Sequence, residues 1–145
     1  MMQNTVTTGF KFVEHMDYYK HENKSKRILI VDDDLEFRLI LSELLVGLGY
    51  SISTAKDGKA ALRCLSMMED LPQLILLDSH MPEAGGKEFF KLRKRMHALT
   101  HIPVIVISGD MAATDEYKHD ACACVLKPLD RLEIIDVVAS KLSLA

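Results

Sequence analysis

Short apolar runs alternate with stretches of helical periodicity along most of this chain, and this alternation restricts the fold more than any other feature. Four runs are apolar enough to be strands buried on both faces: Ile28–Val31, Leu74–Leu77, Val104–Ile107 and the weaker Cys122–Leu126. A fifth run, Tyr50–Ala55, alternates in the way that an edge strand does. Strands that alternate with helices form parallel sheets with helices on both faces. The chain is therefore predicted to be an α/β three-layer sandwich around a five-stranded parallel sheet.

The stretches between these runs are predicted to be one-sided helices. Their apolar residues recur at helical spacing, which predicts these buried positions: Phe37, Ile40 or Leu41, Leu44 and Leu48; Ala61 or Leu62, Leu65 and Met68; Phe89 or Phe90, Arg93 and Met96; Leu132, Ile135, Val138 and Leu142. Asp34, Asp57 and Asp130 are the predicted N-caps, and Gly47 or Gly49 is predicted to end the first helix.

Composition excludes several classes of protein. The chain has 145 residues, of which 48% are hydrophobic and 27% charged, enough for one domain with a substantial core. A net charge of −3 gives no general attraction to nucleic acid or anionic membranes, and no apolar run has the length of a membrane span. The N-terminus also lacks the pattern of a signal peptide. We therefore expect a cytoplasmic protein that contacts neither nucleic acid nor membrane, with reduced thiols at Cys64, Cys122 and Cys124.

Residues 1–25 are predicted to be an N-terminal extension to a domain that spans residues 26–145. They are polar, contain no Leu, Ile or Pro, and lead into the charged stretch at residues 20–26. Phe12, Met16 and Tyr19 recur at the spacing of a short amphipathic helix, which would dock or dimerise. A partly ordered tail is the favoured alternative.

The chemistry is expected at the carboxyl ends of the strands, where open parallel sheets bind their ligands. The residues at this edge are Asp32, Asp33, Asp34, Asp78, Ser108 and Lys127. Two carboxylates about 4 Å apart repel by about 4 kcal/mol at an effective dielectric of about 20, so such a cluster must take up a proton or a cation. Oxygen ligands suit Mg²⁺ or Mn²⁺ rather than zinc. A metal, a lysine and a hydroxyl around one carboxylate are the parts needed for phosphoryl transfer to that carboxylate.

Four sequence blocks resemble, in order, the signatures of the receiver domain of two-component response regulators: Ile28–Asp34, Leu74–Gly86, Pro103–Gly109 and Val125–Pro128. One block alone would be weak evidence, but four in order at successive strand ends are highly specific. The resemblance covers about residues 26–142 and implies a flavodoxin-like (βα)5 fold. It also implies a phosphoacceptor signalling domain that catalyses only its own phosphorylation and dephosphorylation.

The resemblance implies a role for each matched residue. Asp78 would accept the phosphoryl group from a histidine kinase or a histidine phosphotransfer protein. Asp33 and Asp78 would bind Mg²⁺ directly, with the backbone carbonyl of His80 as a third ligand and Asp32 acting through water. Lys127 would pair with Asp78 and then with the phosphoryl oxygens.

Other residues would act around the phosphoryl group. Ser108 would turn inward to hydrogen-bond it. His80 and Asp110 lie two residues beyond Asp78 and Ser108, at positions whose side chains in the family flank the phosphoryl group and modulate its hydrolysis. For His80 the alternative is a solvated side chain at the rim of the cleft. Asp34 is expected to cap the first helix rather than to join the metal site.

The predicted output switch departs from the family pattern. Cys124 stands where the family usually carries a mobile Tyr or Phe, and the segment after Ser108 is about three residues shorter than is typical, nearly one helical turn. Movement of Ser108 is therefore expected to be coupled to residues 109–119, with Met111 and Tyr117 as the apolar contacts. The alternative is that Cys124 is simply a small buried residue in a conventional switch.

Two other functions compete with the phosphoacceptor. Phosphatases of the haloacid dehalogenase type also use an aspartyl nucleophile with Mg²⁺, but they carry a second acid where this chain has His80, and the length leaves no room for a cap domain. A pseudo-receiver that binds its partner constitutively commonly lacks an acid or the lysine, and none is missing here. We expect output through contact with a downstream protein, by a monomer or weak homodimer, whether the chain acts alone or within a larger protein.

Overall fold

The computed structural model describes residues 26–81 and 85–143, and the predicted extension with its short helix lies outside them. The sheet contains β1 (Arg27–Val31), β2 (Ser51–Ala55), β3 (Leu74–Asp78), β4 (Val104–Ser108) and β5 (Ala123–Leu126). All four pairings are parallel, in the order β2-β1-β3-β4-β5. The predicted edge strand is β2, at one edge of the sheet. The structure thus confirms the predicted flavodoxin-like (βα)5 fold.

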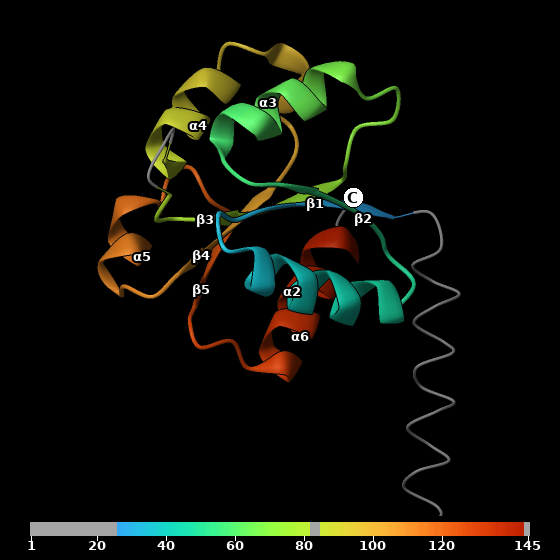
Figure 1. The fold of residues 1–145 in the computed structure, drawn as a ribbon. Helices are drawn as coiled ribbons and strands as arrows, with labels where there is room; N and C mark the ends of the chain where they lie inside the picture. Colours follow the sequence, from blue (N-terminus) through green and yellow to red (C-terminus); the bar gives the residue numbers. More distant parts are fainter. Residues whose placement is uncertain (1–25, 82–84, 144–145) are drawn as a thin grey trace, which may run out of the picture.

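Helices cover both faces of this sheet. They are α2 (Leu35–Gly47), α3 (Gly58–Met67), α4 (Gly86–Arg93), α5 (Ala112–Glu116) and α6 (Arg131–Ser143), with a 3₁₀ turn at His97–Leu99. Figure 1 shows α3 and α4 on one side of the sheet and α2 and α6 on the other. None of the described helices is long and apolar enough to cross a bilayer.

Successive strand residues pack into two different cores, one on each side of the sheet. Leu77 and Val106 belong to the core under α3, α4 and α5, whereas their neighbours Leu76 and Ile107 belong to the core under α2 and α6. These four side chains are at most 1% exposed. Burial on both faces explains why the central strands are continuously apolar.

The predicted N-caps are confirmed. Carboxylate oxygens of Asp34, Asp57 and Asp130 accept hydrogen bonds of 2.8–3.2 Å from backbone amides two or three residues further on. Such a cap contributes about 1 kcal/mol to stability. Helix α2 ends at Gly47, and Gly49 follows with a φ of 96°, a backbone conformation that glycine adopts without strain. Asp34 is therefore a capping residue, as expected.

The apolar faces of two helices differ from the sequence prediction. In α6, Leu132 is 71% exposed, while Ile134 is completely buried in its place. In α2, Leu41 is buried, which is one of the two alternatives predicted, but Leu45 is completely buried where Leu44 was predicted. Both helices contain neighbouring apolar residues that satisfy a helical period almost equally well. The angle at which each helix lies on the sheet decides which of them is buried.

Arg93 is buried at the end of α4, as its place in the apolar pattern predicts. Its Nε donates to the carbonyl oxygen of Leu99 at 3.0 Å, and its Nη2 donates to those of Thr100 and Ile102 at 3.0 and 2.6 Å. The planar guanidinium thus pairs with three backbone acceptors at once, which a lysine ammonium cannot do in the same geometry. These bonds hold the connection between α4 and β4.

Candidate functional site

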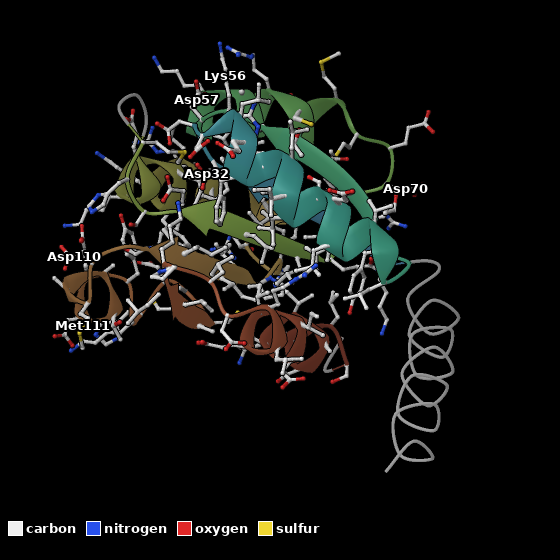
Figure 2. The ribbon with its side chains drawn as sticks, turned by 60° about the horizontal axis from the view of Figure 1, so that its bottom comes forward. Asp32, Lys56, Asp57, Asp70, Asp110 and Met111 are labelled. Atoms are coloured by element: carbon white, nitrogen blue, oxygen red, sulfur yellow. The ribbon has the colours of Figure 1, made fainter. Side chains whose placement is uncertain are left out.

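The charged residues predicted to act together meet at the carboxyl edge of the sheet. Asp32 follows β1, Asp78 ends β3 and Lys127 follows β5. In Figure 2, Asp32 and Asp110 lie toward the end of the molecule where these strands finish, and Asp70 lies toward the opposite end. The sheet order brings β1 and β3 side by side, so the two buried acids come from adjacent strands.

Three carboxylates form a cluster at this edge. Oxygen atoms of Asp32, Asp33 and Asp78 all lie within 4.8 Å of one another. Asp32 and Asp78 are 1% and 6% exposed, whereas Asp33 faces solvent. The cluster is open to solvent on the side of Asp33 and offers three anionic oxygen donors. It therefore fits a hard divalent cation such as Mg²⁺, which usually retains several waters. The three carboxylates that the sequence predicts at the metal site are therefore brought together.

Lys127 bridges the two buried acids. Its Nζ lies 3.1 Å from Oδ2 of Asp32 and 3.6 Å from Oδ1 of Asp78. The expected pairing with Asp78 is thus present, but the shorter contact is with Asp32. The ammonium also lies 4.1 Å from the ring centroid of Phe37, a cation–π contact that sequence reasoning did not identify. The available signal was that Phe37 lies in the first turn of a helix that begins at the site.

The charged form of the Asp78 carboxyl is disfavoured at its site. Burial, followed by the charge of Asp32, raises the pKa of Asp78 from 3.8 to about 6, although Lys127 acts in the opposite direction. The backbone N–H of His80, 3.4 Å from Oδ1 of Asp78, also lowers the pKa. One lysine therefore does not compensate for burial and neighbouring acids, so a bound cation would be strongly stabilised here.

The Ser108 hydroxyl is buried at the end of β4, with 1% exposure. Its Oγ accepts a hydrogen bond from the Asp110 backbone N–H at 3.0 Å and is hydrogen-bonded to Oγ of Ser79 at 2.7 Å. Ser79 was not predicted to be a site residue, because a serine that follows a strand is usually part of a turn. The side chains of His80 and Asp110 are both exposed, at the positions expected for residues at the rim of the site.

The short helix after Ser108 is present as α5, which has 5 residues. Cys124 is half-buried on the adjacent strand, and its Sγ lies 4.0 Å from the carbonyl oxygen of Ala113 in α5. Of the two predicted apolar contacts, Tyr117 is 3% exposed and belongs to the same core as Cys124. The prediction for Met111 is wrong, since this side chain is 75% exposed.

Tyr117 joins α5 to α4. Its ring centroid lies 5.7 Å from that of Phe90, and its hydroxyl lies directly over Gly86. A Cβ at position 86 would come within 2.7 Å of the phenol oxygen and 3.1 Å of the ring carbon that bears it. An aromatic ring therefore belongs to the same core as Cys124, but it comes from the residue that follows α5 rather than from β5.

The fold and the acid–lysine cluster together define a receiver-type domain, and comparison with known proteins agrees. The chain belongs to the response regulator receiver domain family, whose model matches residues 28–139. It is 32% identical over 111 residues to a two-component response regulator of Arabidopsis thaliana, covering 74% of this chain and 21% of that protein. It is also 32% identical over 125 residues to an autoinducer sensor kinase/phosphatase of Vibrio cholerae, covering 83% of this chain and 18% of that protein.

A solved structure shows the same fold. The signal receiver domain of a histidine kinase from Syntrophus aciditrophicus superposes with a TM-score of 0.73 at 29% identity, covering 82% of this chain and 91% of that one. The chain spans only about a fifth of the length of the two sequence relatives, at 21% and 18%. The likeness therefore concerns the receiver domain and not the other parts of those proteins.

Proposed function

We propose that this chain is a phosphoacceptor, in which Asp78 receives a phosphoryl group from a histidine kinase or a histidine phosphotransfer protein. The observation that carries the proposal is the setting of the Asp78 carboxylate, 3.6 Å from the Lys127 ammonium and within 4.8 Å of the acids of a cation site. A buried carboxylate with a cation and a lysine beside it has what an in-line phosphoryl transfer requires.

In the proposed transfer, an Asp78 oxygen attacks phosphorus while the phosphorus–nitrogen bond to the donor histidine breaks, and the bonding electrons leave with the imidazole. Mg²⁺ or Mn²⁺ would be held by Asp33 and Asp78, with the His80 carbonyl as a third ligand and Asp32 acting through water. The cation supplies charge neutralisation for the phosphoryl oxygens. The Lys127 ammonium offers N–H donors to the same oxygens.

The Ser108 hydroxyl is proposed to hydrogen-bond the phosphoryl group, and His80 and Asp110 to modulate its access to water. Hydrolysis by water regenerates Asp78 and releases inorganic phosphate, so the only reaction catalysed is on the chain itself. The output is proposed to be contact with a downstream protein, made in the cytoplasm by a monomer or weak homodimer without contact to nucleic acid.

The test is phosphorylation by acetyl phosphate in the presence of Mg²⁺, measured by intact mass and by peptide mapping. The parent protein should gain one phosphoryl group, and chelation of the metal should prevent this. Asp78→Asn, which keeps the shape but removes the nucleophile, should gain none. Asp115→Asn, an exposed acid on α5, should behave as the parent does. A phosphorylated Asp78→Asn protein would show that another residue is the acceptor.

A further inference from the structure

Two buried hydroxyls lie side by side at the ends of the central strands. The oxygens of Ser79 and Ser108 are 2.7 Å apart, and the two residues are 7% and 1% exposed. Their backbones are held in register, because the Ser79 N–H donates to the carbonyl oxygen of Ile107 at 3.0 Å. A hydroxyl pair fixed at this distance and shielded from water is a formed hydrogen bond and not a chance approach.

This pair lies on the opposite side of the sheet from the Asp78 carboxylate. Ser108 is two residues beyond Val106, which faces the core under α4 and α5, so its side chain points to that side. Asp78 is two residues beyond Leu76, which faces the core under α2 and α6, where Lys127 contacts Phe37. The Ser108 hydroxyl must therefore turn away from Ser79 before it can reach a group bound to Asp78.

We propose that Ser79 is a positioning residue, which holds the Ser108 hydroxyl away from Asp78 until a phosphoryl oxygen replaces Ser79 as its hydrogen-bond partner. The inference rests on the proposed function of Asp78. It makes the resting position of Ser108 one of two discrete side-chain conformations, because Ser79 and the Asp78 carboxylate lie on opposite sides of the sheet and one orientation of the hydroxyl cannot reach both. The apparent affinity for a ligand that needs the second state is the intrinsic affinity multiplied by the fraction of molecules already in that state.

The same exchange reaches α5. Ser108 Oγ also accepts the backbone N–H of Asp110 at 3.0 Å, and the Asp110 carboxylate accepts that of Ala112 at the start of α5. When Ser108 turns toward Asp78, the Asp110 amide loses this acceptor. The bond between Ser79 and Ser108 thus holds not only a side chain but also the backbone that leads into α5.

The experiment is a calorimetric titration with beryllofluoride, a mimic of the phosphoryl group, in saturating Mg²⁺. Ser79→Ala removes the resting partner, so beryllofluoride should bind about 2- to 10-fold more tightly than to the parent, which is the contribution of one neutral hydrogen bond. Ser79→Thr keeps the hydroxyl and should restore the affinity of the parent. Ser79→Cys, close to serine in size with only a weak donor, should also bind more tightly.

A double-mutant comparison isolates the pair. In a Ser108→Ala background, Ser79→Ala should leave the beryllofluoride affinity unchanged, and in all variants the affinity for Mg²⁺ alone should equal that of the parent. An unchanged or weaker beryllofluoride affinity in Ser79→Ala would overturn the role of Ser79 while leaving Asp78 as the acceptor. A parent protein that binds no beryllofluoride would overturn the proposed function itself, and this role with it.

Discussion

Neutralising Asp78 should make the metal-free protein more stable at neutral pH. Burial first, and the charge of Asp32 second, raise the pKa of this carboxyl from 3.8 in the unfolded chain to about 6 in the folded protein. The folded protein therefore binds the proton more tightly, and the stability that this provides is lost as the pH rises from about 4 through about 6. A pKa difference of this size corresponds to about 3 kcal/mol.

The substitution Asp78→Asn keeps the shape of the side chain and removes its titration. The free energy of unfolding of the variant should match that of the parent well below about pH 4 and exceed it by about 3 kcal/mol above about pH 7. The measurement is urea denaturation of both proteins at a series of pH values in the presence of a chelator. Carboxyls that do not interact with Asp78 contribute equally to both proteins, so the difference reports on the site.

The exposed acid Asp115 provides the matched control, since Asp115→Asn makes the same chemical change outside the site. Its pH profile of stability should follow that of the parent. A constant difference between Asp78→Asn and the parent over the whole pH range would refute the raised pKa. A variant less stable than the parent above about pH 7 would show that pairing with Lys127 outweighs the cost of burying the carboxylate.

Three further predictions concern other parts of the molecule. Mg²⁺ at one hundred times its dissociation constant should stabilise the parent by about 2.7 kcal/mol, and thermal melts should show no such gain in Asp33→Ala; an equal gain would place the ion elsewhere. Arg93→Met leaves three backbone carbonyls without their donor and should cost about 3 kcal/mol or more in urea denaturation, whereas the exposed control Arg95→Met should cost little. Beryllofluoride should change hydrogen exchange in residues 109–119; a change confined to β5 and α6 would contradict coupling through α5.

The arrangement of the sheet could be predicted from the sequence because the burial of a strand determines which of its residues are apolar. Three continuous apolar runs indicated the central strands, and the alternating run at Tyr50–Ala55 indicated one edge. The prediction that the fourth run, Cys122–Leu126, is buried on both faces is wrong, because β5 is the other edge strand and is only partly buried. The site followed from topology, since residues at the carboxyl ends of parallel strands must share one edge. Asp32, Asp78 and Lys127 could therefore be grouped although up to 95 residues separate them.

Contacts that depend on side-chain direction could not be predicted in the same way. The bond between Ser79 and Ser108 requires the register of β3 against β4 to be known to the residue, and apolar runs do not specify it. The exposed Leu132 reflects a similar ambiguity, because periodicity alone does not choose between adjacent apolar positions of a helix. The cation–π contact of Lys127 depends on how α2 lies across the end of the sheet.

The fit of Tyr117 over Gly86 has a consequence for how this domain can change in evolution. A side chain at position 86 would meet both the phenol oxygen, at 2.7 Å, and the ring carbon that bears it, at 3.1 Å. Loss of the hydroxyl alone, as in a change to Phe, would remove only the first of these contacts. A side chain at position 86 therefore requires the Tyr117 ring to shift or to be replaced by a smaller residue, so these two positions are expected to covary among relatives of this domain.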